Sequence, residues 1–121
     1  MIEKLGVKGR VWSECSDAVY APLDDDEVRS LTKQVIESLD AGVQVLVYSG
    51  DKDWICNWRG GEEWTNLLDY KGKKEFNKQK YSTWTVDSEA SGEWKSAQGL
   101  TFLRFYDAGH LVPMDQPNRS F

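Results

Sequence analysis

The stretch that decides the fold of this 121-residue chain is "DAGVQVLVYSGDKD", residues 40–53. A glycine turn at Gly42 leads into a β-branched and apolar run over 43–48, which ends in polar residues that include Asp51 and Asp53. Continuous apolar runs are typical of strands buried on both faces, as in parallel sheets covered by helices. We therefore expect a buried strand over 43–48 with a functional site beyond its C-terminal end, where open α/β sheets build their sites.

A helix is expected directly before this strand, over residues 24–41. Its apolar residues recur on one face at helical spacing: Val28, Leu31, Val35 and Leu39. Asp24 and Glu27 match a capping box at its start, and Gly42 is a stop signal at its end. Helix, tight glycine turn and buried strand make up half of a β-α-β unit, so the sequence predicts an α/β fold.

The rest of the chain predicts one further helix and three short strands. The helix covers residues 56–68, with Gly60 and Gly61 near its start. Residues 70–80 form a basic loop or short helix that faces solvent. The strands are expected over 82–87, 92–97 and 100–106, because "SEASGE" and "QG" between them are turn signals.

Composition excludes several classes of function. Fifteen basic against twenty acidic residues give a net charge of −5 and a sequence pI near 4.9, which argues against nucleic acid as a partner. No run approaches the ~20 apolar residues of a membrane span, and the N-terminus has no signal-peptide pattern. One histidine with two distant cysteines argues against a zinc site, so neither a metal nor a cofactor is expected. The six tryptophans leave two readings open, a Trp-rich core or a surface that meets a partner.

Two candidate catalytic side chains, Asp53 and His110, each follow a predicted strand. If these strands are parallel neighbours, the side chains meet, and an aspartate fixes the tautomer of a bound histidine and stabilises its imidazolium form. The order Asp before His is that of α/β-hydrolases, although their G-x-S-x-G elbow is absent from these residues. The alternative, a hydrogen-bonded loop histidine, stays open on the spacing alone. "GDKD" at 50–53 indicates a turn rather than a calcium loop, because regularly spaced oxygen ligands are missing.

Two long blocks carry a resemblance to a known family. "VLVYSGDKDWICNWRGGEEW" at 45–64 and "TFLRFYDAGHLVPMDQP" at 101–117 resemble the C-terminal part of serine carboxypeptidases of the carboxypeptidase Y and cathepsin A type. The resemblance spans essentially the whole chain. It implies the C-terminal portion of an α/β-hydrolase fold, an incomplete sheet with helices on its faces. It also implies hydrolysis of C-terminal peptide bonds through an acyl-enzyme, with Asp53 as the triad acid and His110 as the triad base.

The resemblance implies further roles for single residues. Cys56 is similar to the free thiol that lines the pocket for the penultimate side chain of a peptide substrate. Leu111 matches a residue lining the pocket for the departing C-terminal residue. Cys15 resembles a half-cystine whose partner lies in the N-terminal part of the family fold and is not Cys56. Asn118 begins a glycosylation sequon, Asn-Arg-Ser, a pattern that also arises by chance.

The resemblance also implies that residues 1–121 are one fragment of a larger domain. The serine elbow, the oxyanion hole, the cap and the final helix of the family are expected outside it. We therefore expect an inactive isolated chain whose partner is the serine-bearing N-terminal part or a second copy, and no nucleic acid or membrane. The expected location of the parent enzyme is vacuolar, lysosomal or secreted. The alternative is a non-catalytic interaction module that pairs with another chain or with itself.

Overall fold

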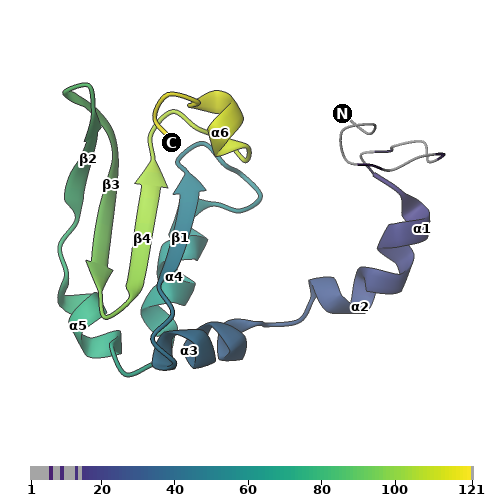
Figure 1. The fold of residues 1–121 in the computed structure, drawn as a ribbon, viewed down its shortest axis with the longest axis horizontal. Coiled ribbons are helices and arrows are strands. Elements are labelled where there is room, and N and C mark those ends of the chain that lie inside the picture. Colours follow the sequence, from purple (N-terminus) through teal and green to yellow (C-terminus); the bar gives the residue numbers. More distant parts are fainter. Residues whose placement is uncertain (1–5, 7–8, 10–12, 14, 121) are drawn as a thin grey trace. The chain divides into compact units, whose positions relative to one another are not determined.

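The structure is a computed structural model that describes residues 6, 9, 13 and 15–120, apart from the side chain of Glu27. The chain divides into two compact units, Met1–Ser30 and Leu31–Phe121. The described part of the first unit contains three short helical turns, α1 (Asp17–Tyr20), η2 (Ala21–Leu23) and α2 (Asp24–Glu27). The second unit carries the sheet and the candidate site, and Figure 1 shows its elements.

The helix predicted over 24–41 is only half correct. A regular helix, α3, covers Thr32–Asp40, whereas α2 ends before it at Glu27. The predicted capping box is wrong, because the N-cap of α2 is Leu23 and no side chain caps it; the Glu27 side chain lies outside the described part. Val28 is 86% exposed and Leu31 60% exposed. Short helices depend on burial of their apolar face, so the helix is regular only where Leu39 reaches the core.

Gly42 ends α3 as expected, and this ending also explains why the strand starts later than predicted. Gly42 has φ 87° and donates its N–H to Leu39 O at 3.0 Å, while Val43 N–H donates to Ser38 O at 2.9 Å. These two bonds are those of a Schellman motif. Val43 therefore closes the helix, and the first strand, β1, covers Val45–Gly50 instead of 43–48.

Four strands form one mixed sheet in the order β1-β4-β3-β2. β1 is parallel to β4 (Leu100–Phe105), from Val45 opposite Leu100 to Gly50 opposite Phe105. β3 (Glu89–Ala97) is antiparallel to β4 and to β2 (Ser82–Val86). The three C-terminal strands are thus confirmed, although β3 starts three residues earlier than predicted. The turn before it lies at Asp87 and Ser88, whose φ values of 51° and 68° suit a two-residue hairpin.

Helices cover one face of the sheet. α3, α4 (Trp58–Leu67) and α5 (Lys73–Lys78) lie on this face (Figure 1). The core between them and the sheet consists of buried apolar residues: Leu39, Leu68, Tyr70, Phe76, Leu100 and Phe102. Because Tyr70 and Phe76 are buried, the segment 70–80 does not simply face solvent as expected.

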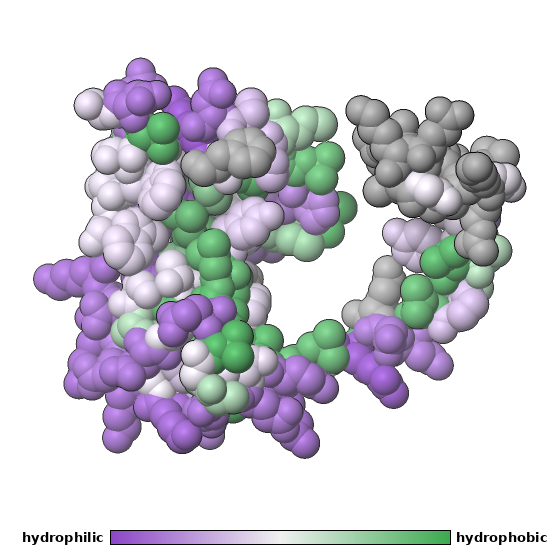
Figure 2. Space-filling view, viewed as in Figure 1, coloured by the Kyte–Doolittle hydropathy of each residue, from purple (hydrophilic) through white to green (hydrophobic). Residues whose placement is uncertain are grey.

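The opposite face of the sheet is only partly covered, which contradicts the expectation that the first strand is buried on both sides. Val45 and Val47 pack against the helix-side core, but the alternating residues Leu46 and Tyr48 are 57% and 49% exposed. α6 (Val112–Asp115) contributes the buried Val112 to a small cluster near one end of this face. Figure 2 shows hydrophobic residues open to solvent in the middle of the face.

The tryptophans divide between the two readings left open by the sequence. Trp58 and Trp64 pack against the helix-side core, whereas Trp54 is 91% exposed. α4 begins at Trp58 rather than at 56, because the Asn57 side chain accepts the Gly60 N–H and caps it. In the part of the chain that the structure describes, no helix has the length and apolar character needed to cross a membrane.

Candidate active site

The turn after β1 and the loop after β4 are held together by backbone contacts. Asp51 N–H donates to Phe105 O at 2.8 Å, and Lys52 N–H donates to Ala108 O at 2.9 Å. A Cβ placed on Gly50 would overlap the carbonyl oxygens of Ala108 and Gly109, so only glycine allows this approach. The two segments that carry the candidate catalytic residues therefore lie in direct contact.

The Asp53 carboxylate is fixed by three hydrogen bonds. Its Oδ1 accepts the backbone N–H of Ile55 at 3.0 Å and of Cys56 at 3.1 Å, and its Oδ2 lies 2.9 Å from Nδ1 of His110. Desolvation raises the pKa of the Asp53 carboxyl, but the hydrogen bonds from His110 and from these two backbone groups together lower it below its ordinary value. The carboxylate is therefore ionised throughout the neutral range.

His110 is held through its loop rather than through burial of its ring. Ala108 is fully buried, and Gly109 N–H donates to Asp115 Oδ2 at 2.7 Å. The imidazole remains 61% exposed, while the Asp53 side chain is only 6% exposed. Because an ionised carboxylate can only accept, the proton of neutral His110 lies on Nδ1 and Nε2 is left as the basic nitrogen. The arrangement can thus take a proton from a group placed at Nε2.

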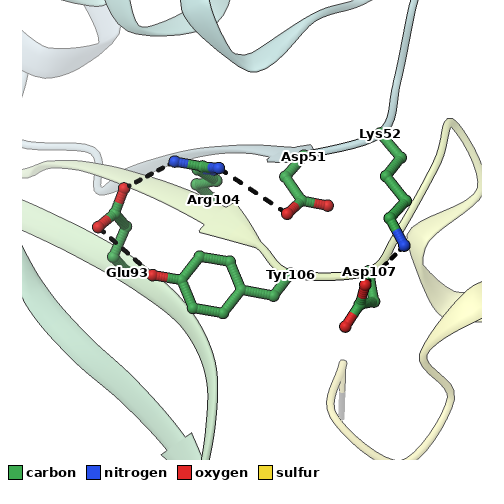
Figure 3. Close-up of polar contacts among 6 residues, drawn as sticks. All are labelled: Asp51, Lys52, Glu93, Arg104, Tyr106 and Asp107. Carbon is green, nitrogen blue, oxygen red and sulfur yellow. Dashed lines mark hydrogen bonds and ion pairs between the residues drawn. The ribbon is translucent and has the colours of Figure 1, made fainter.

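A polar network contacts the turn after β1 through Asp51 (Figure 3). The Arg104 guanidinium pairs with Glu93 at 3.1 Å and with Asp51 at 3.8 Å, and it stacks over the Trp58 ring at 4.0 Å. All three charged side chains are largely buried. Asp51 Oδ1 and Arg104 Nε are buried without a hydrogen-bond partner among the described residues.

A second ion pair joins the same two segments at the surface. Lys52 Nζ lies 2.6 Å from Asp107 Oδ1, as Figure 3 shows, and both side chains are exposed. Their hydrogen bond, with their charge attraction, raises the pKa of Lys52 and lowers that of Asp107. Exposed pairs stabilise a fold little. The pair is one more contact between the turn that carries Asp53 and the loop that carries His110.

The structure brings Cys56 to the site, where its thiol lies near Asp53 and His110. Cys56 is exposed and lines a hollow together with Tyr48, Ile55 and Trp64. Leu111 is 55% exposed and does not line this hollow. Cys15 is a free, exposed cysteine in the first unit, and Asn118 is exposed in a turn after α6. Their implied roles in substrate binding, disulfide formation and glycosylation stay predictions.

Sequence reasoning missed the residues that support the site. Arg104 occurs inside "LTFLRF", and a charged residue within an apolar strand was a signal of a buried partner. Glu93 lies opposite Arg104 in the β3–β4 register, which only the strand pairing reveals. Asp51 lies in the turn that "GDKD" predicted, and its contact with Arg104 ties this turn to β4.

One group of side chains among the described residues could hold a metal ion. A ligand atom from each of Asp53, Cys56 and His110 lies within 4.8 Å of the other two. The sequence argument against zinc considered one histidine and two distant cysteines. It did not include the carboxylate of Asp53, which the fold places close to both of the other residues.

Comparison with known proteins gives one consistent family. The sequence model of a family described as serine carboxypeptidase matches residues 2–121. The chain is 41% identical to a serine carboxypeptidase-like protein of rice over 115 residues, which is 95% of this chain and 27% of the rice protein. It is 44% identical to carboxypeptidase Y of Candida albicans over 95 residues, 78% of this chain and 18% of that protein.

A solved structure agrees with these sequence relatives. A prohormone-processing carboxypeptidase from Saccharomyces cerevisiae matches with a TM-score of 0.75 and 32% identity, over 87% of this chain and 23% of the yeast chain. The chain therefore spans about a quarter or less of the length of the relatives it matches. The mixed sheet and its helices correspond to part of the α/β fold of that enzyme.

Proposed function

Because the chain belongs to the serine carboxypeptidase family, we propose that it supplies the acid–base half of a serine-type carboxypeptidase. His110 acts as the general base and Asp53 as the carboxylate that orients it. The observation that carries this proposal is the 2.9 Å contact between His110 Nδ1 and Asp53 Oδ2 at the adjacent ends of two parallel strands. Such a pair is two-thirds of a nucleophilic triad.

The proposed reaction uses each nitrogen of His110 for one task. Nε2 takes the proton from the serine hydroxyl while the serine oxygen attacks the carbonyl carbon of the last peptide bond. The imidazolium then gives this proton to the leaving amine, and an acyl-enzyme forms. Water, deprotonated by the same nitrogen, attacks the acyl-enzyme, and the imidazolium returns the proton to the serine oxygen as the shortened peptide is released. Asp53, ionised because its pKa is lowered, stabilises the imidazolium in both steps.

The nucleophile and the oxyanion hole must come from outside these residues, since no G-x-S-x-G elbow occurs in them. We therefore expect the isolated chain to be inactive. The serine-bearing part of the enzyme is the partner we propose for the exposed sheet face around Leu46 and Tyr48, and a peptide is the substrate. By analogy with the family, the complete enzyme is vacuolar, lysosomal or secreted.

A chimera tests this function. The segment of Candida albicans carboxypeptidase Y that matches this chain is replaced by residues 1–121, and release of C-terminal residues from blocked dipeptides is measured. We expect activity that falls by roughly 10⁴-fold in Asp53→Asn and by up to about 10⁶-fold in His110→Ala. Asp69→Asn is the matched control, because Asp69 is 92% exposed. A folded chimera that is inactive, or a His110→Ala chimera as active as its parent, would refute the proposal.

The exposed apolar face also favours a second candidate, an interaction module without catalysis. Leu46, Tyr48, Trp84 and Phe105 line a hollow on this face, and β1 has no strand partner on its outer edge among the described residues. Unpaired edges and apolar faces favour association. Sedimentation equilibrium of the isolated chain separates the readings. Self-association of the isolated chain, together with an inactive chimera, supports the interaction module. An active chimera supports the enzyme.

A further inference from the structure

We propose that Asp53, Cys56 and His110 form a binding site for a soft divalent cation such as Zn²⁺. The site goes beyond the proposed peptidase function, and its test requires no enzymatic activity. Its three ligands are a carboxylate oxygen, a thiolate sulfur and an imidazole nitrogen, all within 4.8 Å of one another. This set combines the three side-chain types that bind zinc in proteins.

The local geometry places the ligands around one point. Asp53 and Cys56 lie three residues apart in one turn, and that turn is closed by the bond from Cys56 N–H to Asp53 Oδ1 at 3.1 Å. His110 comes from the neighbouring loop and already lies 2.9 Å from the carboxylate. Ligand atoms around a tetrahedral zinc ion, at bond lengths of about 2.0–2.3 Å, are roughly 3.4–3.6 Å apart. The imidazole must therefore move slightly outward from the carboxylate, whereas the separations from the thiol, which are at most 4.8 Å, require only a small closure.

The mobility of the three side chains suits this adjustment. The Asp53 side chain is 6% exposed and is fixed by two backbone N–H groups, so it provides a rigid anchor. Cys56 is exposed and the His110 imidazole is 61% exposed, so both can rotate toward the ion without disturbing the core. The open side of the cluster leaves the fourth position to water. Thiolate and imidazole ligands select zinc over magnesium or calcium, which prefer oxygen ligands.

Metal binding and the Asp53–His110 hydrogen bond compete for the same carboxylate. When the ion binds, the thiol proton of Cys56 is released to solvent, and the imidazole nitrogen that binds the ion must be free of its proton. Affinity therefore rises with pH. In a complete enzyme the bound ion would also hold His110 away from its orientation toward a nucleophile, so that the site would be inhibitory and not a cofactor site.

Cobalt substitution provides the direct test. Co²⁺ is titrated into the 121-residue chain under reducing conditions, and its ligand-field bands and the sulfur-to-cobalt charge-transfer band are recorded. We expect one Co²⁺ per chain, displaced by Zn²⁺ but not by Mg²⁺. The resonances of the single histidine should broaden in parallel, because His110 is the only imidazole in the chain.

Variants assign the site to its three ligands. Cys56→Ser should abolish the charge-transfer band, and His110→Ala and Asp53→Asn should each weaken binding by at least about tenfold. Cys15→Ser is the matched control, since Cys15 is the second free cysteine, and it should bind as the parent does. Circular dichroism checks that each variant remains folded. The proposal is overturned if no band appears, if Cys15→Ser removes it, or if the urea-unfolded chain binds equally well.

Discussion

Replacing Gly50 by alanine should separate the two loops of the candidate site. A Cβ at this position overlaps the carbonyl oxygens of Ala108 and Gly109, and these backbone atoms must shift to make room. Overpacking of this kind costs about 1–3 kcal/mol. Alanine also makes the unfolded chain less flexible than glycine does, and this effect stabilises the folded state by about 0.4–1 kcal/mol. We therefore expect Gly50→Ala to lower the free energy of unfolding by about 1–2 kcal/mol.

Gly60→Ala is the matched control for this substitution. A Cβ on Gly60 in α4 would lie 3.5 Å from its nearest neighbour, the Asn57 Oδ1 atom, which is an ordinary contact. Alanine favours a helix over glycine by about 0.5–1 kcal/mol, so this variant should be as stable as its parent or more stable. The same chemical change is thus expected to act with opposite sign at the two positions.

Urea unfolding followed by tryptophan fluorescence measures both variants. With an m-value of about 1–3 kcal/mol/M, the midpoint of Gly50→Ala should fall by roughly 1 M. The Nδ1 proton of His110, a single resonance, reports the hydrogen bond to Asp53 and should lose its low-field position in Gly50→Ala only. Equal stability of Gly50→Ala and its parent, with an unchanged His110 resonance, would refute the close-approach argument.

Three further predictions concern the support of the site, its pH dependence and the core. Arg104→Gln leaves two largely buried carboxylates, Asp51 and Glu93, without their cation, so it should cost roughly 2 kcal/mol or more in urea unfolding; an unchanged midpoint would contradict the role of the network. Because the folded pKa of Asp53 is lowered, its ionisation stabilises the fold above the ordinary carboxyl value of about pH 4, and this contribution is lost as pH falls through the folded value. Asp53→Asn should therefore flatten the fall of the urea midpoint in this acid range, and an identical profile would argue against the bond. Phe102→Ala removes a fully buried ring from the central strand β4 and should cost about 3–5 kcal/mol, whereas a loss below about 1 kcal/mol would mean that the helix-side core is not packed as described.

Local sequence patterns predicted most of the secondary structure correctly where tertiary packing agreed with them. Gly42 ends α3 because the residue after the C-cap adopts a left-handed backbone conformation, which glycine allows without strain. The prediction failed at Val28 and Leu31. Both residues have helical spacing, but their side chains are exposed and do not pack into a core. It also failed for Leu46 and Tyr48, since a continuous apolar run does not say whether helices cover one face or both.

By itself the sequence determined the order of the elements, the glycine turn before β1 and the two loops that carry Asp53 and His110. Each of these depends on neighbours along the chain. Only the tertiary structure decided that β1 lies parallel to β4, and this pairing brings together two side chains 57 positions apart. The same pairing brings the Arg104 guanidinium within 3.8 Å of the Asp51 carboxylate. Contacts of this kind depend on strand register and on close backbone approach, which no local pattern encodes.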